Sequence, residues 1–210
     1  WLDMRLCTPH VTSRTYSGSA GQVWHRMIEK WQQIDTSAVT SAYQMFYGCS
    51  SLQSVTLDTS AVTDTSEMFS NCSSLQSVTL DTSAVTSTSW MFYGCSSLQS
   101  VTLDTSAVTS TSQMFANCSS LQSVTLDTGA VTNASSMFNG CPSLQSVILT
   151  GLTRGVSVAY ASLSSTALDA LYTSLGTAAG SQTITVSGNY GTTGDDPSIA
   201  TSKGWTVSGS

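Results

Sequence analysis

Residues 58–80 read DTSAVTDTSEMFSNCSSLQSVTL, and the next residues, 81–103, read DTSAVTSTSWMFYGCSSLQSVTL. The same pattern occurs five times with a constant period of 23 residues, as a column of cysteines shows most simply: Cys49, Cys72, Cys95, Cys118 and Cys141. Self-similarity at a fixed period of about 20 to 50 residues indicates a solenoid. Because a solenoid presents an extended surface instead of a pocket, the repeat favours binding or scaffolding over catalysis.

Each repeat contains a predicted strand. Residues 52–62, LQSVTLDTSAV, fit the leucine-rich pattern L-x-x-L-x-L-x-x-N/C-x-L, with a serine at the usual Asn or Cys position. We expect a short strand at 52–57, with Val55 and Leu57 facing the interior because strand side chains alternate between faces. A turn through residues 58–60 should follow the strand.

The apolar residues after this turn predict a second element on the opposite side. Met68, Phe69, Cys72 and Leu75 follow one another at spacings of one, three and three residues, which is typical of a short helical or 3-10 segment. One copy has too little apolar surface to fold alone, so stacking must bury these columns. We therefore predict an α/β repeat fold, a leucine-rich-repeat solenoid with a parallel β-sheet, short helical or 3-10 segments opposite, and caps at both ends.

The repeat resembles a known family. Its core S-x-MF-x-x-C-x-S-L, followed by V-x-L-D-T-S-x-V-T, is similar to the BspA-type leucine-rich repeats of bacterial surface proteins, over about residues 35–149. Repeats of this type also occur in proteins encoded by tailed phages. The resemblance implies an adhesive or surface-recognition role and an extracellular location, on a bacterial cell surface or on a virion.

Three segments are expected along the chain: an N-terminal arm and capping helix at 1–34, five repeats at 35–149, and a C-terminal cap at 150–210. Before the array, GQVWHRMIEKWQQI places apolar residues at helical spacing, which predicts an amphipathic helix covering the open end of the solenoid. The alternative is a docking helix for a partner protein, in which Trp24 and Trp31 make the contacts.

The last segment alternates between strand and helix patterns. We expect strands near 156–160, 183–187 and 205–207, and helices near 168–175 and 199–203. These elements would continue the sheet as a cap. A separate attachment module is the alternative interpretation.

The charge distribution excludes several classes of partner. Only 9% of the residues are charged, and the net charge is −6. From Trp31 to Thr153 the chain has no Lys or Arg but seven Asp or Glu residues, which repel nucleic acids and anionic membranes. No apolar stretch reaches about 18 residues, so we expect no membrane insertion. Because the chain begins at Trp1 instead of Met, we expect a processed product or a fragment.

No catalytic residue, metal site or cofactor is expected. The two histidines lie outside the array, and Cys7-x-x-His10 with His25 offers at most three metal ligands, at a spacing that does not support a metal site. The chain has no G-x-S-x-G, no phosphate loop and no isolated pair of carboxylates in an apolar setting. The sequence therefore indicates a non-enzymatic protein.

Two columns of equivalent residues, one of cysteines and one of aspartates, each allow a structural and a chemical interpretation. The five cysteines fit buried apolar positions, although equivalent Cα atoms about 5 Å apart also permit inter-repeat disulfides. In the second column an aspartate precedes Thr and a small residue, Ser or Gly, which favours hydrogen-bonded turn caps, and calcium binding is the alternative. These aspartates are Asp35, Asp58, Asp81, Asp104 and Asp127.

Two surfaces are candidate binding sites. One is a regular hydroxyl-rich sheet face, where a repetitive ligand such as a polysaccharide or ice could bind, or where threonine simply favours exposed strand positions. The other is formed at positions where the repeats differ, since aromatic residues there can stack on sugars, anchor an interface, or only pack over the next turn. The candidates are Thr56, Thr79, Thr102 and Thr125 on the sheet, and Tyr47, Trp90 and Tyr93 at the variable positions.

Two functions remain from these observations. The first is an extracellular or virion-surface recognition module that presents its repeats to a glycan or protein ligand. The second is a structural component of a phage particle, such as a tail, fibre or decoration protein, that assembles with neighbouring subunits through its caps.

Overall fold

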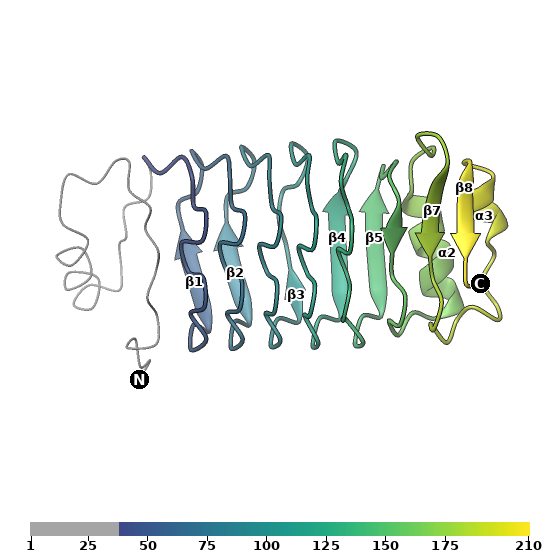
Figure 1. Ribbon diagram of the computed structural model, residues 1–210, viewed down its shortest axis with the longest axis horizontal. Coiled ribbons are helices and arrows are strands. Elements are labelled where there is room, and N and C mark those ends of the chain that lie inside the picture. The colour runs from purple at the N-terminus through teal and green to yellow at the C-terminus, as the bar shows by residue number, and fades with distance from the viewer. Residues whose placement is uncertain (1–37) are drawn as a thin grey trace.

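The computed structural model describes residues 38–210, which form an elongated solenoid with one strand per repeat (Figure 1). The strands run parallel and form two sheets, one of the first two strands and one of the next three. Within each sheet the paired residues lie one repeat apart, as Ser54 and Ser77 or Ser123 and Ser146 do. They are β1 (Ser54–Leu57), β2 (Ser77–Leu80), β3 (Ser100–Val101), β4 (Ser123–Asp127) and β5 (Ser146–Thr150). The predicted solenoid with a parallel sheet is therefore confirmed.

The alternation of buried and exposed side chains fixes the register of each strand. In β4, Val124 and Leu126 are buried, whereas Ser123, Thr125 and Asp127 are exposed. A slip of one residue would turn the apolar pair outward and bury the polar side chains, so the sequence fixes the register strongly. Because all repeats share this alternation, the strands present one continuous polar surface, which we call the strand face.

On the side opposite the strands, the structure of each repeat differs from the prediction. The helical or 3-10 segment expected there is absent from the described repeats, and residues 66–71 and their equivalents form stacked turns instead. The main-chain N–H of Phe69 donates to the carbonyl of Met91 in the next repeat at 2.9 Å, whereas a helix would direct it back along its own chain. Glu67, at φ 56, interrupts a right-handed helix in the same segment. We call this surface the turn face.

The interior consists of columns of identical side chains. Phenylalanine rings stack nearly parallel along the axis, with centroids 5.4 to 5.9 Å apart and interplanar angles of 4 to 6°. Methionine, cysteine and leucine columns lie beside them, and nearly all of these side chains are fully buried. Close packing along the whole array ties each repeat to its two neighbours, which makes the array a stiff scaffold for surface residues.

Buried threonines add a polar ladder between the repeats. Each Oγ1 donates to a main-chain carbonyl in the following turn, at 2.6 to 3.0 Å. Within residues 38–210, every buried side-chain nitrogen or oxygen has a hydrogen-bond partner, so burial of these hydroxyls leaves no polar group unsatisfied. The ladder consists of Thr59, Thr82, Thr105 and Thr128.

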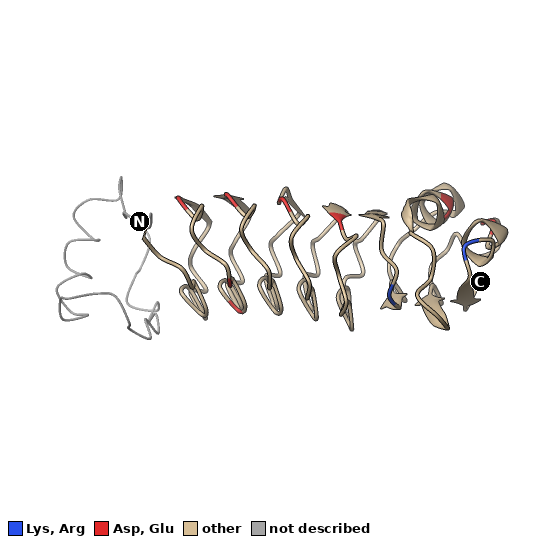
Figure 2. Cartoon of the chain, turned by 90° about the horizontal axis from the view of Figure 1, so that it is seen from above, with Lys and Arg blue, Asp and Glu red and all other residues tan. Residues whose placement is uncertain are grey.

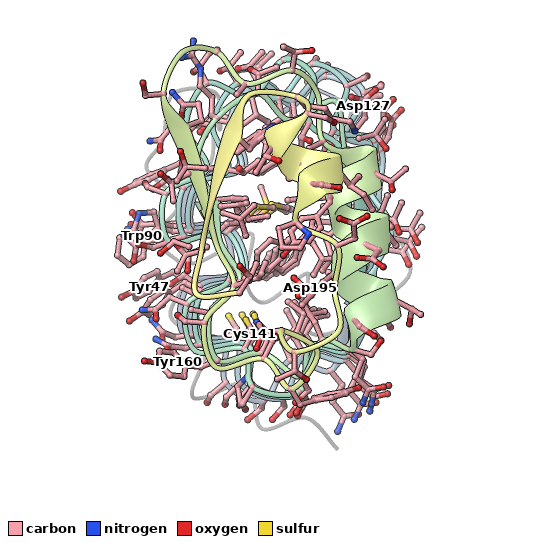
Figure 3. All side chains as sticks on the ribbon, turned by 90° about the vertical axis from the view of Figure 1, so that its right-hand side faces the viewer. Tyr47, Trp90, Asp127, Cys141, Tyr160 and Asp195 are labelled. Carbon is pink, nitrogen blue, oxygen red and sulfur yellow. The ribbon has the colours of Figure 1, made fainter. Side chains whose placement is uncertain are left out.

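After β5 the two sides of the solenoid differ. On the turn side lies a parallel sheet of β6 (Val156–Ser157), β7 (Gln182–Thr185) and β8 (Trp205–Ser208). On the strand side, α2 (Ser165–Ser174) and α3 (Ser198–Thr201) take the place of further strands (Figures 1 and 3).

Hydrogen bonds cap α2 at its start and join its C-terminal end to the array. The Ser164 side chain caps its first turn by accepting from the N–H of Ala167. At the other end, the main-chain N–H of Leu149, in β5, donates to the Ser174 hydroxyl at 3.0 Å. The helix therefore covers the edge that β5 would otherwise leave open.

No helix within residues 38–210 is long and apolar enough to cross a membrane. The predicted capping helix with Trp24 and Trp31 lies outside the described residues, as do Cys7, His10, His25 and Asp35.

Candidate ligand-binding surface

The strand face is polar from β1 to β4, and in β5 the half-buried Ile148 takes the threonine position. Its four candidate threonines are exposed and occupy equivalent positions of successive repeats, and the first two pair in register. A row of aspartates runs along the same side (Figure 2). This face carries no exposed aromatic side chain. The threonines are Thr56, Thr79, Thr102 and Thr125.

The aspartate column caps turns. Oδ1 of Asp81 accepts from the main-chain N–H of Ser83 at 3.0 Å and from its hydroxyl at 2.7 Å, and Asp104 does the same with Ser106. These hydrogen bonds hold the pKa of both carboxyl groups below the usual value. In the described part of the chain no three metal-binding side chains come together. The geometry thus agrees with the turn-cap interpretation.

The cysteine column consists of buried thiols. The Sγ of Cys95 donates to the carbonyl oxygen of Phe69 at 3.1 Å, and the same contact recurs at 3.0 Å in the other repeats for Cys72, Cys118 and Cys141. Burial raises the pKa of Cys95 to about 12 and that of Cys141 to about 11. Since the thiolate is the reactive form, burial makes these thiols less reactive than an exposed cysteine.

The turn face carries the aromatic candidates. The rings of Trp90 and Tyr93 pack against each other, with centroids 4.8 Å apart and planes tilted by 43°, and both side chains are half-buried. Trp90 has a φ of 59°, like the residues at its position in the other repeats. The pair thus forms one fixed aromatic unit on the third repeat.

Tyr47 lies on the same face, two repeats earlier (Figure 3). It occupies the position of Tyr93 and is 39% exposed. Turns about 4.8 Å apart place the two backbones roughly 10 Å from each other. The equivalent residue of the intervening repeat is the small, buried Ser70, so no large side chain separates the two tyrosines.

A fixed carboxylate lies between these aromatic residues. Glu67 accepts a hydrogen bond from Nε2 of Gln44 at 2.8 Å and one from the Tyr43 hydroxyl at 3.3 Å. The nearby negative charge raises the pKa of the tyrosine. Sequence reasoning missed this group, although a tyrosine at position 43, where the other repeats have serine, was a signal.

The most exposed aromatic residue on this face was also missed. Tyr160 is 76% exposed and lies on the same side of the solenoid as Tyr47 and Trp90, opposite α2 (Figure 3). It follows β6, beyond the regular 23-residue array, so periodicity did not reveal it. The large apolar side chains that are exposed within residues 38–210 are all tyrosines: Tyr43, Tyr47, Tyr160 and Tyr190.

A family model described as BspA type leucine rich repeat region matches residues 40–165 in six copies. The match thus extends past the five repeats visible as a regular period, into the start of α2. No curated protein and no solved structure matches the chain.

Proposed function

The chain belongs to the BspA-type leucine-rich repeat family, and from this premise we propose that it is a recognition module whose turn face binds a ligand outside the cell. Repeats of this family generally serve as surface or protein-interaction modules without enzymatic activity. The proposed location is a bacterial cell surface or a virion. The proposed contact residues are Tyr47, Trp90 and Tyr93.

The main support for the proposal comes from the sequence positions at which the repeats differ. Core and strand positions repeat almost unchanged, whereas the positions of Trp90 and Tyr93 hold Gln113 and Ala116 one repeat later. Packing does not require an aromatic residue at either position, since neighbouring repeats stack in the same way without one. Their presence on the turn face of the third repeat is explained by contact with something outside the chain.

The physical properties of this site suit recognition. Aromatic side chains supply a large contact area and lose little conformational entropy on binding. Here Trp90 and Tyr93 are already ordered by their packing against each other, and the array beneath them is stiff. A ligand therefore meets a pre-organised surface, which reduces the free energy needed to order the site.

The test replaces the pair with residues that the chain itself uses. Trp90→Gln with Tyr93→Ala introduces the residues of the next repeat, so the backbone geometry is already known to accept them. The labelled wild-type chain should bind saturably to some members of a panel of bacterial surfaces, glycans and proteins. The double variant should bind the same members at least about tenfold more weakly, since truncated hot spots typically cost more than 1 kcal/mol.

A matched variant tests the opposite face. Thr79→Ala with Thr102→Ala removes two exposed hydroxyls of the strand face and leaves the aromatic pair intact. If this variant loses binding and the aromatic variant keeps it, the site lies on the strand face and the proposal is wrong. If the wild-type chain binds no member of the panel, the structural role in a phage particle, with assembly through the ends of the solenoid, replaces it.

A further inference from the structure

Tyr160 occupies a position where other turns carry asparagine. A Cβ atom added to Gly188 would lie 2.5 Å from the Tyr160 ring, so the ring packs over this glycine of the following turn. Two asparagines of the array cover the glycine of the next repeat in the same way, and they share the positive φ of Tyr160: Asn71 at 62°, Asn117 at 63° and Tyr160 at 58°. An aromatic ring thus replaces a small amide in an established backbone position.

This replacement extends a row of aromatic residues along the axis. Tyr47 and Tyr93 immediately precede Gly48 and Gly94, which belong to the same column of equivalent positions as Asn71, Asn117 and Tyr160. Tyr47, Tyr160 and Trp90, whose ring packs against that of Tyr93, lie on one face of the solenoid (Figure 3). Tyr47 belongs to the first described turn, Tyr93 to the third and Tyr160 to the sixth. With turns about 4.8 Å apart, the row spans roughly 24 Å, with gaps of about 10 and 14 Å. A compact ligand cannot reach all three positions, whereas an extended chain can.

Charge restricts the kind of chain that fits. Residues 38–210 contain nine Asp or Glu residues and only two basic ones, Arg154 and Lys203. The fixed carboxylate of Glu67 lies within the row, between the turns of Tyr47 and Tyr93. These negative charges, and Glu67 within the row in particular, disfavour a polyanionic chain.

The composition of the face favours a carbohydrate over a peptide. Among the described residues the exposed large apolar side chains are all tyrosines, and no leucine, isoleucine or methionine is exposed. The side chains around these tyrosines mostly carry hydroxyl or amide groups. The cores of protein interfaces are enriched in methionine and arginine beside the aromatic residues, and no methionine is exposed among residues 38–210. Separate flat rings in polar surroundings instead match pyranose sugars, whose C–H faces stack on aromatic rings while their hydroxyls form hydrogen bonds.

We propose that the turn face binds a linear neutral polysaccharide along the solenoid axis, with Tyr160 as a distal subsite beyond Trp90 and Tyr93. The proposal rests on the proposed recognition function and specifies its ligand class. Glu67 accepts hydrogen bonds from sugar hydroxyls in the first part of the row, and Tyr160 holds the far end of the chain by stacking.

The experiment compares short and long oligosaccharides by calorimetry. Disaccharides and octasaccharides of the cello-, chito- and manno- series are the probes, because a disaccharide reaches one aromatic position and an octasaccharide spans several. We expect octasaccharides of one series to bind the wild-type chain at least about tenfold tighter than the disaccharide. Tyr160→Asn introduces the residue that the chain has at the equivalent positions Asn71 and Asn117. This variant should bind octasaccharides about tenfold more weakly than the wild type and disaccharides with unchanged affinity. Tyr160→Phe should retain both affinities because it keeps the ring.

The controls separate this inference from the recognition function. If Tyr160→Asn binds octasaccharides like the wild type while Trp90→Gln with Tyr93→Ala does not bind, the distal subsite is wrong and the recognition function stands. Tighter binding to heparin than to neutral sugars, or binding to a protein with none to any neutral oligosaccharide, overturns the ligand class alone. Absence of binding by the wild-type chain to every probe and panel member overturns both. Circular dichroism spectra of the variants that match the wild type show that a loss of affinity is not a loss of folding.

Discussion

Alkaline pH is expected to destabilise the array through its buried cysteines. In the folded chain the pKa of Cys95 is about 12 and that of Cys141 about 11, whereas the ordinary value is 9.0, and burial is the main cause of both shifts. A thiol is neutral when protonated, so burial favours the protonated form. Because the folded pKa lies above the unfolded one, the contribution of each cysteine is intact below pH 9 and declines as the pH rises toward the folded value.

The size of the effect follows from proton linkage. At pH 10 an unfolded cysteine has released its proton and a folded one has retained it, which lowers the free energy of unfolding by about 1.4 kcal/mol per thiol. Cys95 and Cys141 together account for about 3 kcal/mol. Small domains are stable by only about 5 to 15 kcal/mol, so this loss is a large fraction of the total.

Urea unfolding followed by circular dichroism between pH 7.5 and pH 10 measures this loss. The control is Cys95→Ser, whose hydroxyl does not ionise in this range and can still donate to the Phe69 carbonyl that accepts from the thiol at 3.1 Å. Whatever its stability at pH 7.5, this variant should lose about 1.4 kcal/mol less than the wild type on going to pH 10. In a Cys7→Ser background, a thiol reagent should modify the native array far more slowly than the unfolded chain.

Two results would refute the reasoning. One is a free energy of unfolding that stays constant from pH 7.5 to pH 10, and the other is an equal decline in the wild type and in Cys95→Ser. Either result means that the thiols ionise in the folded array as readily as in the unfolded chain, so that the column is not excluded from water.

The ring stack and the turn glycines give further predictions, each measured by urea unfolding at pH 7. Phe92→Leu loses two stacked neighbours at 5.6 and 5.7 Å and should cost about 1 to 3 kcal/mol, whereas Phe138→Leu loses one at 5.9 Å and should cost about half as much. Equal losses would show that stacking contributes nothing beyond burial. Gly48→Ala and Gly94→Ala both strain a φ of 71°, by about 1 kcal/mol, but only at Gly94 would the new Cβ lie 2.7 Å from Oδ1 of Asn71. A larger loss for Gly94→Ala is therefore expected, and the opposite order would contradict it.

The sequence predicted the solenoid because a repeat that stacks on its own copies must present the same side chains to each neighbour. Val124 and Leu126 alternate with polar residues and so define a strand, its inner face and its register. The family match confirms the identification of the repeat type. Periodicity was a weaker guide to the other side of each turn, where the spacing of Met68 and Phe69 fits a helix and a tight turn equally well.

What the repeat by itself determined is therefore the fold, its parallel sheet and the identity of the stacked columns. Only the tertiary structure decided the form of the turns, because the partner of the Phe69 N–H is a carbonyl in another repeat. It also decided the surface that we propose to bind sugar. Glu67 joins the aromatic row through a hydrogen bond from Gln44, the equivalent residue of the preceding repeat, which the period alone does not reveal as a contact. Tyr160 joins it through a backbone position shared with Asn71 and Asn117 that the 23-residue period does not predict. These contacts depend on which residues are close in space. A regular spacing in the sequence predicts such neighbours only while the repeat continues unchanged.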